Sequence, residues 1–287
     1  MQHNFVISLP RSGSTVLTRM LSSREDVMCL PETCFPHLLD HLTNAEWEDR
    51  RWVAALYLAS CSDGSPLTLE EAILCISPSH EMSLRNIALK VAAKSGRNPK
   101  NIRAVVWKST RLVGSSKSIA GIGGRYLILH RPRLNVYESQ FRVPFGKLNH
   151  APSRFALFAA SYDAAFRRYP RQVTMEIEYA HIPEQLDAIF SWIGSESPQV
   201  DNSSGALQTT AGRRAWHSQI DKPFHNDDVK KISNLSSSQI HIFNTTSTAL
   251  RMVPLIGTLA RRQADRRTAQ AMKTMARSIL KASDRTP

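Results

Sequence analysis

The start of the chain combines an apolar segment, a loop of small polar residues and a helix, and this order constrains the fold more than any other feature. Residues 4–9 (NFVISL) are rich in β-forming residues and are followed by Pro10, as is typical of a buried strand. Residues 11–15 (RSGST) predict a tight polar turn, and apolar residues recur at helical spacing over residues 16–21. The sequence therefore predicts the first half of a βαβ unit.

Apolar strands alternate with helices along the rest of the chain. Further strands are expected at residues 104–107, 126–129 and 173–177, and helices at residues 155–169 and 185–193. This alternation predicts an α/β fold of three layers (α/β/α), with a central, mostly parallel sheet. Together with the polar loop after the first strand, it resembles the P-loop nucleotide-binding type. We expect one α/β domain over residues 1–250 and a basic helical tail over residues 251–287.

The loop PRSGST after the first strand has the properties of an anion cradle, and we call these residues 10–15 the anion loop. Gly13 permits a tight turn, the backbone N–H groups from Ser12 to Thr15 can point at an anion, and the next helix adds its positive dipole end. The hydroxyls of Ser12, Ser14 and Thr15 add donors. The nucleotide-triphosphate form GxxxxGK[ST] has a lysine where this chain has Ser14, and Arg11 supplies a cation instead. The alternative is a Ser/Thr helix cap that needs no ligand; the position after the first strand favours anion binding.

A second basic element follows the strand at residues 126–129. In YLILHRPRLNVYESQFR, Arg131 stands at the end of the strand and Ser139 follows eight residues later in a predicted helix. Arg131 can grip a phosphate through charge-assisted hydrogen bonds, and Ser139 can add its hydroxyl. Taken singly, Arg131 could equally be a solvated residue at the end of a strand, and Ser139 could equally be a helix residue without a functional role.

Together the two elements resemble the PAPS-dependent sulfotransferase family, where PAPS is 3′-phosphoadenosine-5′-phosphosulfate. The resemblance implies that the PRSGST loop binds the 5′-phosphosulfate and that Arg131 and Ser139 bind the 3′-phosphate. A third segment, TTAGRRAWHSQI at residues 209–220, resembles the late nucleotide-binding loop of bacterial members. By that resemblance either Arg213 or Arg214 contacts the 3′-phosphate, and the choice between them stays open.

The resemblance also implies catalytic roles. Arg11 would stabilise the bridging oxygen of the leaving group PAP, the desulfated nucleotide, and Lys108 would contact the sulfonate. Family members with a catalytic histidine carry it two residues after this lysine, where this chain has Thr110. Glu32 in LPETCF is the replacement candidate for the base, provided that burial raises its pKa; alternatively it caps or salt-bridges the helix near Phe35. His37 and His130 are lesser candidates for the base.

The predicted reaction moves a sulfuryl group from PAPS to a hydroxyl or amine of a small-molecule acceptor and releases PAP, with no metal required. One alternative is a nucleotide-dependent, kinase-like phosphotransferase, and another is a non-catalytic module that binds a nucleotide or polyanion. The acceptor pocket is expected within residues 33–100 and 143–160, because variable helices and loops build it. The acceptor itself and the oligomeric state do not follow from the sequence.

Charge and cysteine content bear on partners and location. The formal net charge is +13, but residues 251–287 hold nine Lys/Arg and two Asp, so the tail supplies most of it. We therefore do not expect nucleic-acid binding. Four cysteines without metal-ligand spacing, and no apparent signal peptide or transmembrane run, predict a cytoplasmic protein. The amphipathic basic tail could contact a membrane surface or a partner, or could simply be a solvated helix face.

Overall fold

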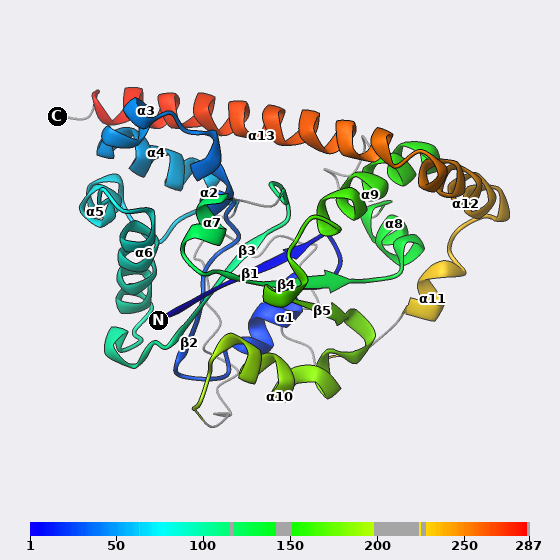
Figure 1. Ribbon diagram of the computed structural model, residues 1–287, viewed down its shortest axis with the longest axis horizontal. Helices are drawn as coiled ribbons and strands as arrows, with labels where there is room; N and C mark the ends of the chain where they lie inside the picture. The colour runs from blue at the N-terminus through cyan, green and yellow to red at the C-terminus, as the bar shows by residue number, and fades with distance from the viewer. Residues whose placement is uncertain (63, 115–116, 142–150, 198–223, 225–227, 286–287) are drawn as a thin grey trace.

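The computed structural model describes residues 1–62, 64–114, 117–141, 151–197, 224 and 228–285 (Figure 1). Within these residues the chain forms a central sheet with helices on both sides. The predicted α/β fold with a parallel sheet between two helical layers is confirmed.

The sheet has five strands in the order β2-β3-β1-β4-β5, and every pair is parallel. The strands are β1 (Gln2–Ser8), β2 (Val27–Cys29), β3 (Ala104–Ser109), β4 (Arg125–His130) and β5 (Thr174–Glu178). The central strand β1 pairs with β3 on one side and β4 on the other, so it has no free edge. Its residues are buried almost throughout because both of its faces are covered, as expected for a parallel sheet.

Helices cover the two faces of the sheet unequally. One face packs against α1 (Ser14–Leu21) and α10 (Ile182–Ile193), whose buried residues include Leu17, Ile189 and Phe190. The remaining helices lie on the other face and beyond its edges. They are α2 (Phe35–Leu38), α3 (Asn44–Glu48), α4 (Arg50–Ser60), α5 (Leu69–Cys75), α6 (His80–Lys94), α7 (Lys117–Gly121), α8 (Arg133–Phe141), α9 (Pro152–Phe166), α11 (Asp228–Ile232), α12 (Ser237–Met252) and α13 (Pro254–Ser283).

The last two helices form a layer of their own across α9 and α4 (Figure 1). Ala269, Met272 and Ala276 of α13 are buried against the main core. Arg261 is buried too, with its guanidinium paired to Asp265 and 4.9 Å from the ring centre of Tyr162. None of the described helices is long and apolar enough to cross a membrane. The division of the chain at residue 250 stays a prediction.

The start of α13 approaches α9 closely at Gly257. A Cβ atom built on Gly257 would lie 2.8 Å from the backbone carbonyl oxygen of Ala160. In an ordinary helix, replacement of glycine by alanine stabilises the fold. Here we expect Gly257→Ala to destabilise it by about 1–3 kcal/mol, because the new methyl group overpacks against backbone. Urea unfolding would measure the change.

Gly121→Ala is the matched control, because nothing lies within 4 Å of the Cβ it would add at the end of α7. Equal stability of the two variants would show that α13 can shift away from α9 at no cost.

Candidate functional site

The predicted site residues lie at the carboxyl edge of the sheet, where loops leave parallel strands and ligands commonly bind. Arg11 follows β1, Glu32 follows β2, Lys108 is near the end of β3, and Arg131 follows β4. Tyr179, which sequence reasoning missed, follows β5. The sheet thus brings together residues that lie up to 168 positions apart, counted from Arg11 to Tyr179.

The loop after β1 is held in an unusual backbone conformation. Arg11 has φ 73° and Gly13 has φ 93°, and the amide of Ser12 donates to the carbonyl of Leu9 at 3.2 Å. Gly13 is the N-cap of α1, and no side chain caps that helix. The alternative of a Ser/Thr cap is therefore wrong, because the left-handed glycine ends the loop where a capping side chain would act. Ser12 is fully buried, and its hydroxyl has no hydrogen-bond partner among the described residues.

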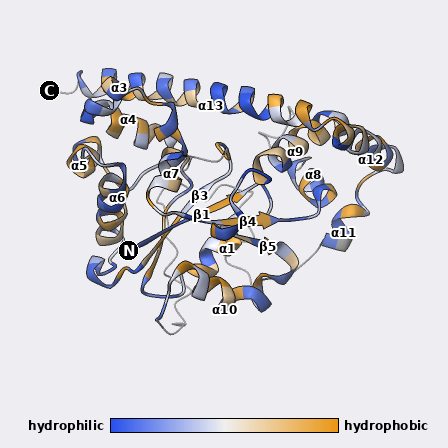
Figure 2. Ribbon diagram, in the orientation of Figure 1, coloured by the Kyte–Doolittle hydropathy of each residue, from blue (hydrophilic) through white to orange (hydrophobic). Residues whose placement is uncertain are grey.

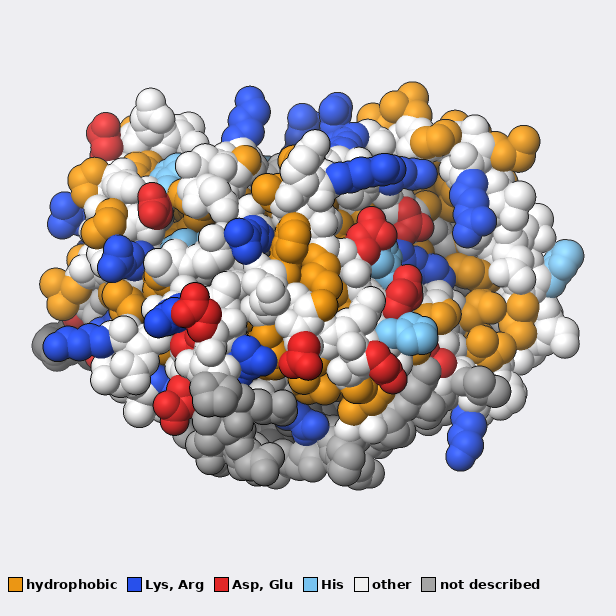
Figure 3. Space-filling model, turned by 60° about the horizontal axis from the view of Figure 1, so that its bottom comes forward, with side chains coloured by type: hydrophobic (Ala, Val, Ile, Leu, Met, Phe, Trp, Pro, Cys, Tyr) orange, Lys and Arg blue, Asp and Glu red, His pale blue; other side chains and the backbone are white. Residues whose placement is uncertain are grey.

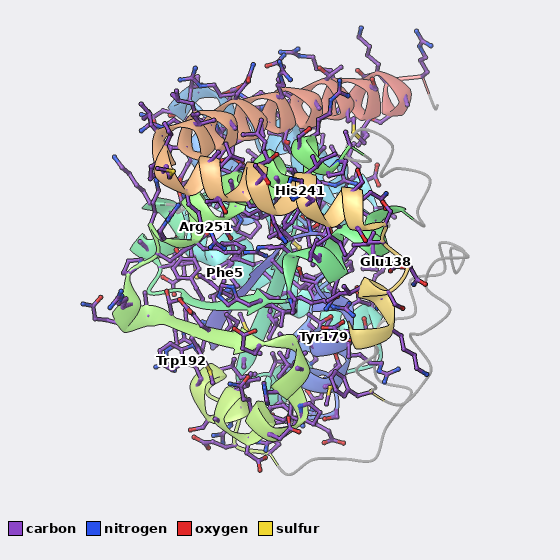
Figure 4. All side chains as sticks on the ribbon, turned by 90° about the vertical axis from the view of Figure 1, so that its right-hand side faces the viewer. Phe5, Glu138, Tyr179, Trp192, His241 and Arg251 are labelled. Atoms are coloured by element: carbon purple, nitrogen blue, oxygen red, sulfur yellow. The ribbon has the colours of Figure 1, made fainter. Side chains whose placement is uncertain are left out.

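The close approach of Tyr179 also requires a glycine at position 13. A Cβ atom at Gly13 would lie 2.3 Å from the ring of Tyr179. The ring of Tyr179 carries the guanidinium of Arg131 at 4.1 Å on its face, and Phe224 lies 5.4 Å away, between ring centres. Figure 4 shows Tyr179 on the side of the molecule that also carries Glu138 and α11. The position of Tyr179 directly after a predicted strand was the available sequence signal.

The two motifs of the sequence meet in space. Nε of Arg11 donates to the hydroxyl of Ser139 at 3.3 Å, and the guanidinium of Arg131 donates to the carbonyl of Arg11 at 3.4 Å. Burial, and then the charge of Arg131, lowers the pKa of Arg11. Two neighbouring guanidinium groups in a buried place favour an anion between or beside them.

Arg131 has an acidic partner that the sequence analysis did not find. It is 6% exposed, and its Nε donates to a carboxylate oxygen of Asp228 at 2.9 Å. Asp228 begins α11, which packs on α8. The ion pair keeps the buried charge of Arg131 compensated, as a buried charge requires.

Glu32 and Lys108 form a second ion pair, between the loop after β2 and the end of β3. Nζ of Lys108 lies 3.1 Å from the Glu32 carboxylate and donates to the hydroxyl of Thr15 at 3.0 Å. The hydroxyl of Thr110 donates to the other carboxylate oxygen of Glu32. The backbone sets this geometry, since the amide of Thr33 donates to the carbonyl of Lys108 at 3.0 Å. The lysine therefore links the carboxylate to the anion loop.

The electrostatics of Glu32 differ from the expectation. Burial acts to raise its pKa, but Lys108 and the hydrogen bond from Thr110 outweigh burial, and the pKa is lowered. The condition that burial raises this pKa is thus not met with Lys108 and Thr110 in these positions. Glu32 also does not cap α2, whose N-cap is Cys34 without a side-chain hydrogen bond.

The other candidates lie apart from these two clusters or outside the described residues. His37 is buried beneath Phe5, and burial lowers its pKa to about 4, so it is neutral at physiological pH. His130 points toward α9, 3.6 Å from the carboxylate of Glu176. Arg213 and Arg214 lie outside the described residues, so neither is placed.

A cavity of about 700 Å³ lies elsewhere, between α9, β5 and the start of α13. Its lining includes His130, Arg167, Arg171, Glu176 and Arg251 but no residue of the PRSGST loop. The motifs and this hollow therefore mark different places, and the site assignment rests on the motifs. Among the described residues, no group of three His, Cys, Asp or Glu side chains is arranged to hold a metal ion.

Comparison with known proteins bears on the family. A model of the sulfotransferase family matches residues 4–109. Among solved structures, the chain is similar to the "Sulfotransferase Domain from the Synechococcus PCC 7002 Olefin Synthase" at 15% identity and a TM-score of 0.48, covering 85% of this chain and 94% of that one. It is also similar to the "Sulfotransferase Domain from the Curacin Biosynthetic Pathway" at 18% identity and a TM-score of 0.44, covering 86% and 97%. No curated protein matches the chain significantly.

The family match covers the strand β1, the PRSGST loop, Glu32 and β3 up to Ser109. It therefore includes both the anion loop and the Glu32–Lys108 pair. Over residues 4–109 the chain matches the model of the sulfotransferase family, in agreement with the resemblance that its motifs carry there.

Proposed function

We propose that the protein transfers a sulfuryl group from PAPS to a hydroxyl or amine of a small-molecule acceptor and releases PAP. One observation carries the proposal: Lys108 touches both the carboxylate of Glu32 and the hydroxyl of Thr15 at the anion loop. A single cation thus joins the group that would take the acceptor's proton to the loop that would hold the donor's sulfonate.

The donor would lie along the carboxyl edge of the sheet. The 5′-phosphosulfate would lie over the PRSGST loop, where backbone N–H groups and the start of α1 favour an anion. The buried hydroxyl of Ser12 is available there, since no described residue bonds it. The 3′-phosphate would bind Arg131 and Ser139, which Arg11 already connects through its own contacts with both residues. Arg213 or Arg214 would complete this end, as the resemblance implies.

The reaction would be an in-line displacement at sulfur. The acceptor oxygen or nitrogen forms a bond to sulfur while the bond from sulfur to the bridging oxygen breaks, and that electron pair stays on the 5′-phosphate of PAP. Glu32 takes the proton that the acceptor loses. Arg11 and the loop amides stabilise the charge that grows on the leaving phosphate, which is the dominant contribution in transfers of this kind.

The lowered pKa of Glu32 has a role in this scheme. The contacts with Lys108 and Thr110 outweigh burial and favour the ionised form of Glu32. A sulfonate at Thr15 would draw the ammonium of Lys108 toward itself and away from the carboxylate. The effect of burial would then dominate, and the pKa of Glu32 would rise when the acceptor's proton must be accepted. Donor binding would thereby make Glu32 a stronger base.

Donor binding can be measured by thermal stabilisation with PAP and with 5′-AMP, which lacks the 3′-phosphate. We expect PAP to stabilise the protein by about 2.7 kcal/mol at a hundredfold excess over its Kd, and 5′-AMP at the same concentration to stabilise it less. Arg131→Ala should remove most of the difference between PAP and AMP, because a charge-assisted hydrogen bond is worth about 1.5–3 kcal/mol.

The exposed Arg168, beyond α9, gives the control variant Arg168→Ala, which should behave as the wild type. Stabilisation only by ATP with magnesium would instead indicate a phosphotransferase and would overturn the sulfotransferase proposal.

The role of Glu32 can be separated from donor binding by Glu32→Gln. We expect turnover with a phenolic or alcohol acceptor to fall by about 10²–10⁴-fold, the usual contribution of a general base. Stabilisation by PAP should persist, because the variant removes no proposed donor contact. Glu178→Gln, which alters an exposed carboxylate at the end of β5, is the matched control. Undiminished turnover in Glu32→Gln would remove Glu32 from the mechanism.

The link between Lys108 and Glu32 predicts a pH effect. In the wild type, kcat/KM should hold its plateau down to the ordinary glutamate pKa of 4.5, because the pKa of Glu32 is lowered. In Lys108→Met the main lowering interaction is lost and burial acts to raise this pKa. The acid limb of the kcat/KM profile should therefore move to higher pH, whatever the loss in absolute rate. If the acid limb of the kcat/KM profile does not move, a group other than Glu32 determines its position.

A further inference from the structure

The corner where α12 meets α13 exposes a group of large apolar side chains. Met252 is 80% exposed, Leu255 63% and Leu259 55%. Val253 and Ile256, in the same short stretch, are 47% and 43% exposed. Of the other exposed apolar residues of the described surface, Leu74 and Met82 lie on α5 and α6, and Ile242 and Met275 lie further along α12 and α13. We call these five residues the apolar corner; a contiguous group of this kind marks an interaction surface.

The packing of α13 explains why this corner faces outward. Gly257 and Arg261 turn toward the body, where Gly257 touches α9 and Arg261 is 4% exposed. Leu255 and Leu259 lie one turn apart on the opposite face, and Arg262 and Arg266 continue that face along the helix. The face of α13 that meets α9 is therefore buried. The opposite, apolar face packs against none of the described residues.

The two helices that form the corner carry a strong excess of positive charge. Four exposed arginines flank the corner: Arg251, Arg262, Arg266 and Arg267. Asp265 is the only acidic residue in α12 and α13, and its carboxylate is paired with Arg261. No acid of these two helices therefore offsets the four exposed arginines.

The position of the corner in the molecule limits what can cover it. It lies at one end of the long axis, where α12 turns into α13 (Figure 1). Figure 2 shows hydrophobic residues gathered at this end of α13, and Figure 3 shows hydrophobic side chains at the upper right with a basic side chain beside them. In Figure 4, Arg251 marks the end of α12 next to the corner. The corner is therefore an exposed apolar surface at one end of the molecule, with exposed arginines beside it.

We propose that this corner docks the protein on the surface of an anionic lipid bilayer. The apolar side chains enter the boundary between headgroups and acyl chains, and the flanking arginines contact lipid phosphates. This is the chemistry of interfacial amphipathic helices, whose affinity combines buried apolar area with attraction to anionic lipid. The inference is independent of the sulfotransferase proposal, since the corner shares no residue with the anion loop.

Vesicle flotation tests the docking with defined lipids. We expect the protein to float with vesicles of phosphatidylcholine and phosphatidylglycerol at 7:3, and not with phosphatidylcholine alone. Leu255→Ser/Leu259→Ser and Arg262→Ala/Arg266→Ala should each weaken binding at least tenfold, on the order of three- to fivefold per basic residue removed. Leu74→Ser is the matched control, because Leu74 is 81% exposed on α5, away from the corner. Thermal unfolding of each variant checks that the fold is intact.

Three outcomes would overturn the proposal. Equal flotation of the Leu255→Ser/Leu259→Ser variant and the wild type would mean that charge alone adsorbs the protein. No flotation of the wild type with anionic vesicles would exclude lipid docking directly. A concentration-dependent dimer, measured by light scattering and abolished by Leu255→Ser, would identify a second copy of the chain as the occupant instead.

Discussion

The pairing of β1 on both sides is the constraint on which the rest of the site depends. Because β1 lies between β3 and β4 in a parallel sheet, the loop that follows it is held between Lys108 and Arg131. A shift of one residue in either ladder would turn alternate side chains to the other face of the sheet. The hydrophobic burial of Phe5, Val6 and Ile7 on alternating faces fixes the register. The geometry of the site is therefore a consequence of core packing.

Compensation of charge is the second property of the site. Arg131 is paired with Asp228, Lys108 is paired with Glu32, and Arg11 bonds the hydroxyl of Ser139. These contacts keep three nearly buried cations from destabilising the fold, because a buried charge without a partner is costly. An anionic donor would replace or share these partners. The contacts that stabilise these three cations are thus those that donor binding would rearrange.

The fold was largely predictable from the sequence, and the site only in part. Apolar runs located β1, β3, β4 and β5 to within two residues, because buried parallel strands read as continuous hydrophobic segments. The motifs placed Arg11, Arg131 and Ser139, whose contacts the structure then showed. Tyr179 and Asp228 were missed, since each acts through contacts with residues more than 45 positions away, Arg131 among them.

The sequence alone determined the order of strands and helices, the glycine in the anion loop and the basic character of the C-terminal helices. These properties are local: they depend on periodicity, backbone freedom and composition. Only the tertiary structure decided the protonation of Glu32, because its pKa reflects the balance between burial and the charge of Lys108, which β3 brings beside it. It also decided which face of α13 is exposed, because α9 covers the side that carries Gly257 and Arg261. Both outcomes depend on distances in space between segments that lie far apart in the sequence.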